Sequence, residues 1–129
     1  MPNTSHKRIL VVDDIPHWRK LLSTLLKDYN LEIIDSYADA VNAIEQSEFS
    51  VVILDIRLED QNIFNVDGVD LLKKIKREQP NTSIVILTGY RESIHDQILL
   101  EYGPRTIIDK GTFDNNEFRE LIQELVGKD

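Results

Sequence analysis

The chain has 129 residues, of which 41% are hydrophobic and 29% charged, the balance of one globular domain (residues 1–129, core about 7–127). The formal net charge of −8 disfavours binding to nucleic acid or to an anionic membrane, and the lack of cysteine excludes disulfides, thiolate nucleophiles and cysteine-ligated zinc. No apolar run approaches the roughly 20 residues that a membrane span needs, and the first residues lack the apolar core of a signal peptide, so we expect a cytoplasmic protein.

The first predicted elements are a buried strand and an amphipathic helix. Residues 9–12 (Ile-Leu-Val-Val) form an unbroken apolar run, which is typical of a strand covered on both faces. Pro16 is well tolerated in a first helical turn, and apolar residues recur after it at i, i+3, i+4, i+7 and i+8. These residues are Trp18, Leu21, Leu22, Leu25 and Leu26. Residues 31–36 then predict a weaker strand.

The central predicted strand ends in a carboxylate. Before it, Ser36 or Asp39 can cap a short helix that ends before Phe49. Residues 51–54 (Val-Val-Ile-Leu) are a second unbroken apolar run, followed at once by Asp55. In open α/β sheets, chemistry collects just outside the carboxyl ends of the strands. Asp55 is therefore a candidate functional residue, although an aspartate in this place is more often a turn or cap residue.

The second half of the chain continues the alternation. A long connection over residues 59–68 leads to a predicted helix over residues 69–77. Residues 83–87 are another buried type of strand, residues 91–102 are helical by composition, and residues 106–108 predict a short strand. The final helix repeats the earlier apolar stripe with Phe118, Leu121, Ile122, Leu125 and Val126.

Strands that alternate with helices through the whole chain predict an α/β domain of about five βα units. Its sheet should be mainly parallel, with right-handed crossovers and helices on both faces, which makes three layers. The carboxyl ends of the strands would then lie at one edge of the sheet. Four of these ends carry polar side chains, namely Asp13 with Asp14, Asp55, Thr88 and Lys110.

This set of side chains suits phosphoryl transfer. Three crowded carboxylates raise one another's pKa unless a cation intervenes, and hard oxygen ligands suit Mg²⁺. Lys110 adds a fixed positive charge, and Thr88 adds a hydroxyl that can donate. A divalent cation, an ammonium and a hydroxyl around one carboxylate form an electrostatic clamp for a phosphoryl group, with Asp55 as the nucleophile.

Each of these residues also has an ordinary structural interpretation. Asp14 could cap the helix that follows it, and Lys110 could belong to a plain turn. Trp18 and Phe118 are expected to be packing residues, and residues 73–77 a solvated helix face. No histidine has metal-ligand spacing, so none is a candidate ligand: His6, His17 and His95.

In this order, the motifs resemble the receiver domain of two-component response regulators over essentially the whole chain. The matching stretches are residues 9–14 (ILVVDD), 51–55 (VVILD), 67–72 (DGVDLL), 84–89 (IVILTG) and 107–110 (IIDK). Each motif alone is weak, but the ordered set is specific. The resemblance implies a CheY-like, flavodoxin-like (βα)5 fold with a doubly wound sheet of five parallel strands. It also implies a phosphoacceptor signalling domain rather than an enzyme.

The resemblance implies a role for each acidic residue. Asp55 would accept a phosphoryl group from a sensor histidine kinase or a histidine phosphotransfer protein. Asp14 and Asp55 would ligate Mg²⁺ directly, together with the backbone carbonyl of Arg57. Asp13 would act on the ion largely through water.

Thr88 and Lys110 would contact the phosphoryl oxygens and link them to the helices that move. Two departures from the family pattern stand next to these residues. The family usually has proline after its lysine, commonly in cis, whereas Gly111 predicts a trans bond and an altered loop here. The family often has an aromatic switch residue where this chain has Ile107. These departures leave open a second interpretation, a pseudo-receiver that binds partners without taking phosphate.

The expected output is through a protein partner. The last predicted helix ends the chain, so we expect a stand-alone receiver that acts on a downstream effector, through a surface at roughly residues 91–126 that could also form a homodimer. Arg57 and Tyr90 would flank the path of attacking water and set the lifetime of the phosphoryl group. Two other classes fit less well. Phosphohydrolases with an aspartate nucleophile typically carry a second aspartate where Arg57 lies, and an FMN module would need a phosphate-cradling loop after the first strand.

Overall fold

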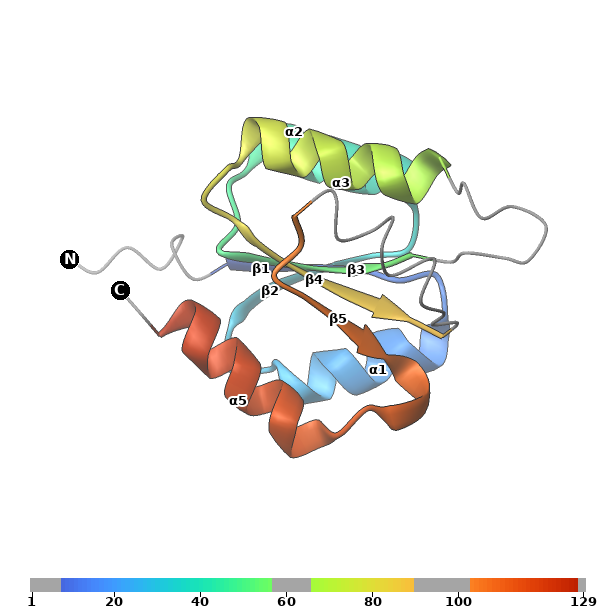
Figure 1. Cartoon of the computed structure of the whole chain (residues 1–129), viewed down its shortest axis with the longest axis vertical. Helices are drawn as coiled ribbons and strands as arrows, with labels where there is room; N and C mark the ends of the chain where they lie inside the picture. The colour runs from blue at the N-terminus through green and yellow to red at the C-terminus, as the bar shows by residue number, and fades with distance from the viewer. Residues whose placement is uncertain (1–7, 57–65, 90–102, 128–129) are drawn as a thin grey trace.

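The computed structural model describes residues 8–56, 66–89 and 103–127. In these residues, five parallel strands form one sheet in the order β2-β1-β3-β4-β5 (Figure 1). The strands are β1 (Arg8–Val12), β2 (Asn30–Ile34), β3 (Val51–Asp55), β4 (Ser83–Thr88) and β5 (Thr106–Asp109). The helices are α1 (Pro16–Leu25), α2 (Tyr37–Gln46), α3 (Val66–Glu78) and α5 (Asn115–Val126), with a short 3-10 turn, η2 (Lys110–Thr112). The predicted flavodoxin-like α/β fold is confirmed.

The strands are apolar on both faces because helices cover both faces. Helices α2 and α3 lie on one side of the sheet and α1 and α5 on the other (Figure 1). Alternate residues of each strand enter two separate cores: Leu10 and Val52 pack with α2 and α3, whereas Ile9 and Val51 pack with α1 and α5. This division explains why the runs at β1 and β3 are unbroken rather than alternating.

The boundaries of several elements differ from the sequence prediction by a few residues. Strand β2 ends at Ile34, and Ser36 then caps α2 by accepting a hydrogen bond from the Asp39 backbone N–H at 3.2 Å. Helix α3 begins at Val66, three residues before the predicted start. The prediction placed the start too late because the apolar periodicity begins only at residue 69. Helix α5 begins at Asn115 after an Asp114 cap. The predicted helix over residues 91–102 lies outside the described residues.

The strand order fixes where a site can form. The chain runs from β1 outward to β2 and then returns past β1 to β3, so the winding direction reverses between β1 and β3. Open α/β sheets bind their ligands at such a reversal, outside the carboxyl ends of the strands. Residues Asp13 and Asp55 lie at those two ends. Within the described residues, no helix is long and apolar enough to cross a membrane.

Candidate phosphoryl and metal site

Three carboxylates meet at the carboxyl ends of β1 and β3. These strands pair in parallel, with Val12 beside Leu54, so the residues that follow are brought together. One carboxylate oxygen from each of Asp13, Asp14 and Asp55 lies within 4.8 Å of the other two. Asp13 and Asp55 are buried, whereas Asp14 is exposed at the rim. The cluster therefore has two carboxylates in a low-dielectric setting and one in contact with solvent.

Lys110 reaches this cluster from the end of the edge strand β5. It follows β5, which is separated from β3 by β4, yet its Nζ atom lies 2.9 Å from Asp13 Oδ2 and 3.4 Å from Asp55 Oδ1. Its side chain is only 7% exposed. Thr88 is buried at the end of β4, the strand that lies between. The structure thus brings together Asp13, Asp14, Asp55 and Lys110 and places Thr88 at the end of the intervening strand.

The electrostatics of Asp55 are unusual for an aspartate. Burial raises the pKa of its carboxyl group to about 6, and the carboxylates of Asp13 and, more weakly, Asp14 act in the same direction. Lys110 lowers the pKa but does not offset burial. Two buried oxygens, Asp13 Oδ2 and Asp55 Oδ1, accept no hydrogen bond of good geometry. Buried, poorly satisfied oxygens of like charge are the donor set that a hard divalent cation would satisfy, so these residues fit Mg²⁺.

Asp13 also shapes the turn between β1 and α1. Its Oδ1 accepts a hydrogen bond from the Ile15 backbone N–H at 2.9 Å, and its backbone carbonyl accepts one from Arg19 Nη1 at 3.0 Å. The N-cap of α1 is Ile15, whose side chain makes no capping hydrogen bond. The alternative interpretation of Asp14 as the N-cap residue is therefore not supported. The orientation of Asp13 leaves its Oδ2 facing Lys110.

Two residues at the site were not predicted from the sequence. The Tyr37 hydroxyl donates a hydrogen bond to the Asp55 backbone carbonyl at 2.8 Å. A Cβ at Gly68 would lie 3.1 Å from that hydroxyl oxygen, so glycine lets α3 approach Tyr37. The Trp18 ring centroid lies 5.0 Å from Lys110 Nζ. Trp18 packs against the α1 and α5 core, as predicted, but nothing in the sequence indicated its second contact.

The two departures from the family pattern have clear structural positions. The Lys110–Gly111 bond is trans, as expected. Asp109 Oδ1 accepts a hydrogen bond from the Gly111 backbone N–H at 2.7 Å, which closes the turn η2. Ile107 is buried in the core beneath α2 and α3. The other residues named from the sequence, Arg57, Tyr90, His6 and His95, lie outside the described residues, and His17 is exposed.

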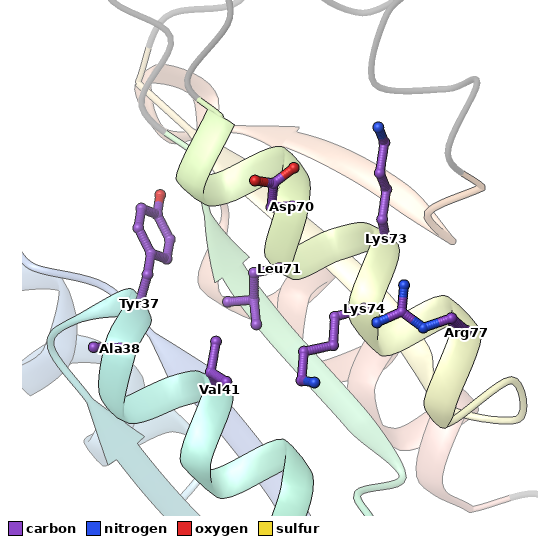
Figure 2. Close-up of a pocket in the computed structure, with 8 residues that line it drawn as sticks. All are labelled: Tyr37, Ala38, Val41, Asp70, Leu71, Lys73, Lys74 and Arg77. Atoms are coloured by element: carbon purple, nitrogen blue, oxygen red, sulfur yellow. The ribbon is translucent and has the colours of Figure 1, made fainter.

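A separate groove of about 520 Å³ lies between α2 and α3 (Figure 2). Tyr37, Val41 and Leu71 form part of its apolar lining, and Lys74 lies along it. The Lys74 ammonium is 3.0 Å from Glu45 and 2.7 Å from Glu78, and its side chain is only 18% exposed. The prediction that residues 73–77 form a solvated helix face is therefore wrong at Lys74, because α2 packs beside it.

Comparison with known proteins gives one consistent family. A sequence model of the response regulator receiver domain matches residues 9–123. An NtrX-like response regulator of Rickettsia felis is 32% identical over 117 residues, which are 89% of this chain and 24% of that protein. The regulatory protein AtoC of Escherichia coli K12 is 27% identical over 125 residues, 95% of this chain and 26% of AtoC. The chain thus spans about a quarter of the length of the curated relatives it matches.

Solved structures agree on the fold. A CheY-like response regulator receiver domain protein from Methanospirillum hungatei JF-1 superposes with a TM-score of 0.80 at 27% identity, covering 95% of this chain and 94% of that one. The receiver domain of the sensor histidine kinase PA1611 from Pseudomonas aeruginosa PAO1 superposes with a TM-score of 0.75 at 21% identity, covering 95% and 98%. That second structure holds a magnesium ion in its active-site cleft.

Proposed function

Because this chain belongs to the response regulator receiver domain family, we propose that it is a phosphoacceptor whose acceptor residue is Asp55. One observation carries the proposal: Asp55 is buried at the end of the central strand with Asp13 and Asp14 on one side and the Lys110 ammonium 3.4 Å away. A buried carboxylate with converging charges is costly for stability. Such an arrangement is typical of a site that binds a charged group.

The proposed reaction is transfer from a phosphohistidine to Asp55. A carboxylate oxygen of Asp55 attacks the phosphorus, an O–P bond forms, and the P–N bond to the imidazole breaks. The electron pair of that bond stays on the imidazole nitrogen, which takes up a proton, and Asp55 becomes an acyl phosphate. The Asp55 carboxylate must be ionised to attack, and a bound Mg²⁺ would oppose the effect of burial, which raises its pKa to about 6.

The residues around Asp55 have distinct proposed roles. Asp14 and Asp55, with the backbone carbonyl of Arg57, would hold Mg²⁺ directly, and Asp13 would act on it largely through water. The PA1611 receiver domain holds a magnesium ion in its own active-site cleft. When bound to this chain, Mg²⁺ supplies positive charge to the carboxylates and the phosphoryl oxygens. Lys110, whose ammonium lies 2.9 Å from Asp13 and 3.4 Å from Asp55, would neutralise charge that develops on those oxygens. Thr88 is proposed to donate its hydroxyl to one of them.

The donor and the output are both proteins in this proposal. The phosphoryl donor is a sensor histidine kinase or a histidine phosphotransfer protein, and a cytoplasmic effector reads the phosphorylated state. The longer relatives, AtoC and the NtrX-like protein, are regulators of which this domain matches about a quarter. A homodimer through the face that contains β5 and α5 would be one way to pass on the change.

Intact mass spectrometry tests the acceptor assignment. The protein is incubated with Mg²⁺ and acetyl phosphate, next to Asp55→Asn and a control, Asp35→Asn, whose carboxylate is exposed and outside the cluster. We expect a gain of about 80 Da, one phosphoryl group, in the wild type and the control, none in Asp55→Asn, and none with EDTA. Labelling that persists in Asp55→Asn would contradict the proposal.

The alternative of a pseudo-receiver has its own outcome in the same experiment. Gly111 and Ile107 are the residues that favour it, because they replace family residues of the loop and the switch. No mass gain, together with no spectral shift on adding beryllofluoride and Mg²⁺, would assign the chain to that class. A beryllofluoride shift without a mass gain would instead indicate rapid hydrolysis of a real acyl phosphate.

A further inference from the structure

Lys110 is the first residue of the turn η2, and its side chain leaves the turn toward Asp13 and Asp55. The residue after it is Gly111, the most permissive residue for the backbone. The Asp109 side chain accepts a hydrogen bond from the Gly111 N–H, which closes the turn. A lysine side chain has four rotatable bonds and a strongly hydrated head. The ion pairs with Asp13 at 2.9 Å and Asp55 at 3.4 Å attract the Lys110 ammonium, and a further contact would restrict where it lies between them.

The Trp18 ring is in the right place to do this. Lys110 Nζ lies 5.0 Å from the ring centroid, inside the roughly 6 Å range in which an indole face attracts a cation. The Lys110 side chain is 7% exposed, so water competes little for the ammonium. An aromatic face accepts no conventional hydrogen bond from the ammonium. It can therefore restrain the ammonium while leaving its N–H donors directed at the oxygens of the site.

Trp18 packs against Phe113, which in turn packs against Phe118. Its ring meets Phe113 edge-on at 5.1 Å and 86°, and Phe113 lies 5.1 Å from the buried ring of Phe118 in α5. Phe113 is the residue directly after η2, the turn that begins at Lys110. The Trp18 ring thus contacts both ends of the turn: the Lys110 ammonium at its start and the Phe113 ring directly after it. Ring contacts therefore join helix α1, the end of the turn and α5.

We propose that Trp18 is a positioning residue that holds the Lys110 ammonium between the Asp13 and Asp55 carboxylates. The Trp18 ring restrains the Lys110 ammonium, a restraint that Gly111 does not provide. The geometric part of the proposal concerns the protein without phosphate. Its kinetic consequence, faster phosphorylation of Asp55, rests on the proposed function.

The geometric part is tested by NMR on metal-free protein labelled with ¹³C-lysine. Methylene protons beside an indole face are shifted upfield by its ring current, so we expect the Lys110 ε-CH₂ signal, assigned by its loss in Lys110→Met, to lie upfield of the other lysines. It should return toward them in Trp18→Leu and remain partly shifted in Trp18→Phe. An unshifted signal in the wild type would overturn the proposal, whether or not the chain accepts phosphate.

The kinetic part is tested by a double-mutant cycle with acetyl phosphate. We expect Trp18→Leu to be phosphorylated about three- to tenfold more slowly than Trp18→Phe, the factor that loss of a partly desolvated cation–π contact gives. In a Lys110→Met background this difference should vanish, because no ammonium remains to be positioned. An equal difference in both backgrounds would show that Trp18 acts only through packing, and would overturn the proposal.

The two parts separate its failure from that of the proposed function. If the wild type shows neither a mass gain nor a beryllofluoride shift, but the Lys110 signal is shifted and responds to Trp18, the proposed function fails and the positioning role stands. If phosphorylation occurs and the Lys110 signal does not respond to Trp18, the positioning role fails and the function stands. Circular dichroism of each variant establishes that it is folded before either comparison is made.

Discussion

Two buried polar clusters lie at opposite ends of the sheet, and they are built in opposite ways. The carboxylate cluster, Asp13, Asp55 and Lys110, stands at the carboxyl ends of the strands. The amide cluster, Gln79 and Thr82, stands before β4, next to the residues that lead into β3. Asp13, Asp55, Gln79 and Thr82 are each exposed by 4% or less, and the Lys110 side chain is exposed by 7%. The two clusters therefore do not differ in their exposure to solvent.

The amide cluster is neutral and satisfied. Gln79 Oε1 accepts hydrogen bonds from the Phe49 backbone N–H and the Thr82 hydroxyl, both at 3.0 Å. Gln79 Nε2 donates to the carbonyls of Ile44 and Ser47 at 2.9 and 2.7 Å. The Thr82 hydroxyl also lies 2.6 Å from the Phe49 carbonyl. These bonds join the end of α3 to the loop between α2 and β3.

The carboxylate cluster is charged and poorly satisfied. Its ammonium lies beside two carboxylates, yet Asp13 Oδ2 and Asp55 Oδ1 accept no hydrogen bond of good geometry. A fully satisfied buried network makes a structure rigid, whereas a poorly satisfied one costs stability. The comparison indicates that the amide end of the sheet is built for stability and the carboxylate end for binding charge. Three substitutions test this division.

The largest effect is expected at Gln79. In Gln79→Leu, the Phe49 N–H and the carbonyls of Ile44 and Ser47 lose their side-chain partner while the volume stays similar. Because each unsatisfied buried group costs about 1–3 kcal/mol, we expect a loss of about 3 kcal/mol of unfolding free energy. Urea unfolding measures it, with the exposed Gln46→Leu as a control that should change by less than about 0.5 kcal/mol. Equal losses of unfolding free energy in Gln79→Leu and Gln46→Leu would contradict a stabilising role for the amide cluster.

Asp55→Asn should have the opposite sign. Between its unfolded value near 3.8 and its folded value of about 6, the Asp55 carboxyl group binds a proton when folded and releases it when unfolded. The stability contributed by that proton is present below about pH 4 and is lost as the pH rises to about 6. Removing the charge should therefore stabilise metal-free protein by about 1–3 kcal/mol at pH 7.

The pH dependence gives this prediction its control. The gain from Asp55→Asn should shrink as the pH falls from 6 to 4 and be absent below it, when urea unfolding is measured at each pH in EDTA. The exposed Asp35→Asn should show no such gain at pH 7. A destabilised Asp55→Asn protein at pH 7 would mean that the Lys110 ion pair outweighs burial, and the carboxylate cluster would then be a stabilising feature.

The smallest effect is expected at Thr82. Thr82→Val keeps the shape of the side chain but removes the hydroxyl, whose single proton is shared between the Phe49 carbonyl at 2.6 Å and Gln79 Oε1 at 3.0 Å. Gln79 Oε1 still accepts a hydrogen bond from the Phe49 N–H, whereas the Phe49 carbonyl loses the Thr82 hydroxyl as its donor. We expect a loss of about 1 kcal/mol by urea unfolding. A loss as large as that of Gln79→Leu would show that the hydroxyl, and not the amide, is the centre of the cluster.

The sequence predicted the carboxylate cluster and missed the amide cluster, for a physical reason. Asp55 and Lys110 interrupt apolar strands at their ends, where the parallel topology collects side chains at one edge. Gln79 and Thr82 flank a proline turn, and polar residues there are ordinarily exposed. Only the packing of α3 beside the loop that ends at Phe49 buries them. The contacts of Trp18 and Tyr37 were missed for the same reason, because each joins segments far apart in the chain.

The alternation of strands and helices, the apolar faces and the polar strand ends can all be predicted from the sequence, because local periodicity and strand composition encode them. The family followed from the order of those strand ends. The tertiary structure alone decided which carboxylates are buried, that Asp55 faces Lys110, and that an indole lies over that ammonium. The strand order and the helices on each face set which side chains are buried and how far apart the charged groups lie. They are properties of neighbours in space, so no single segment of the chain contains them.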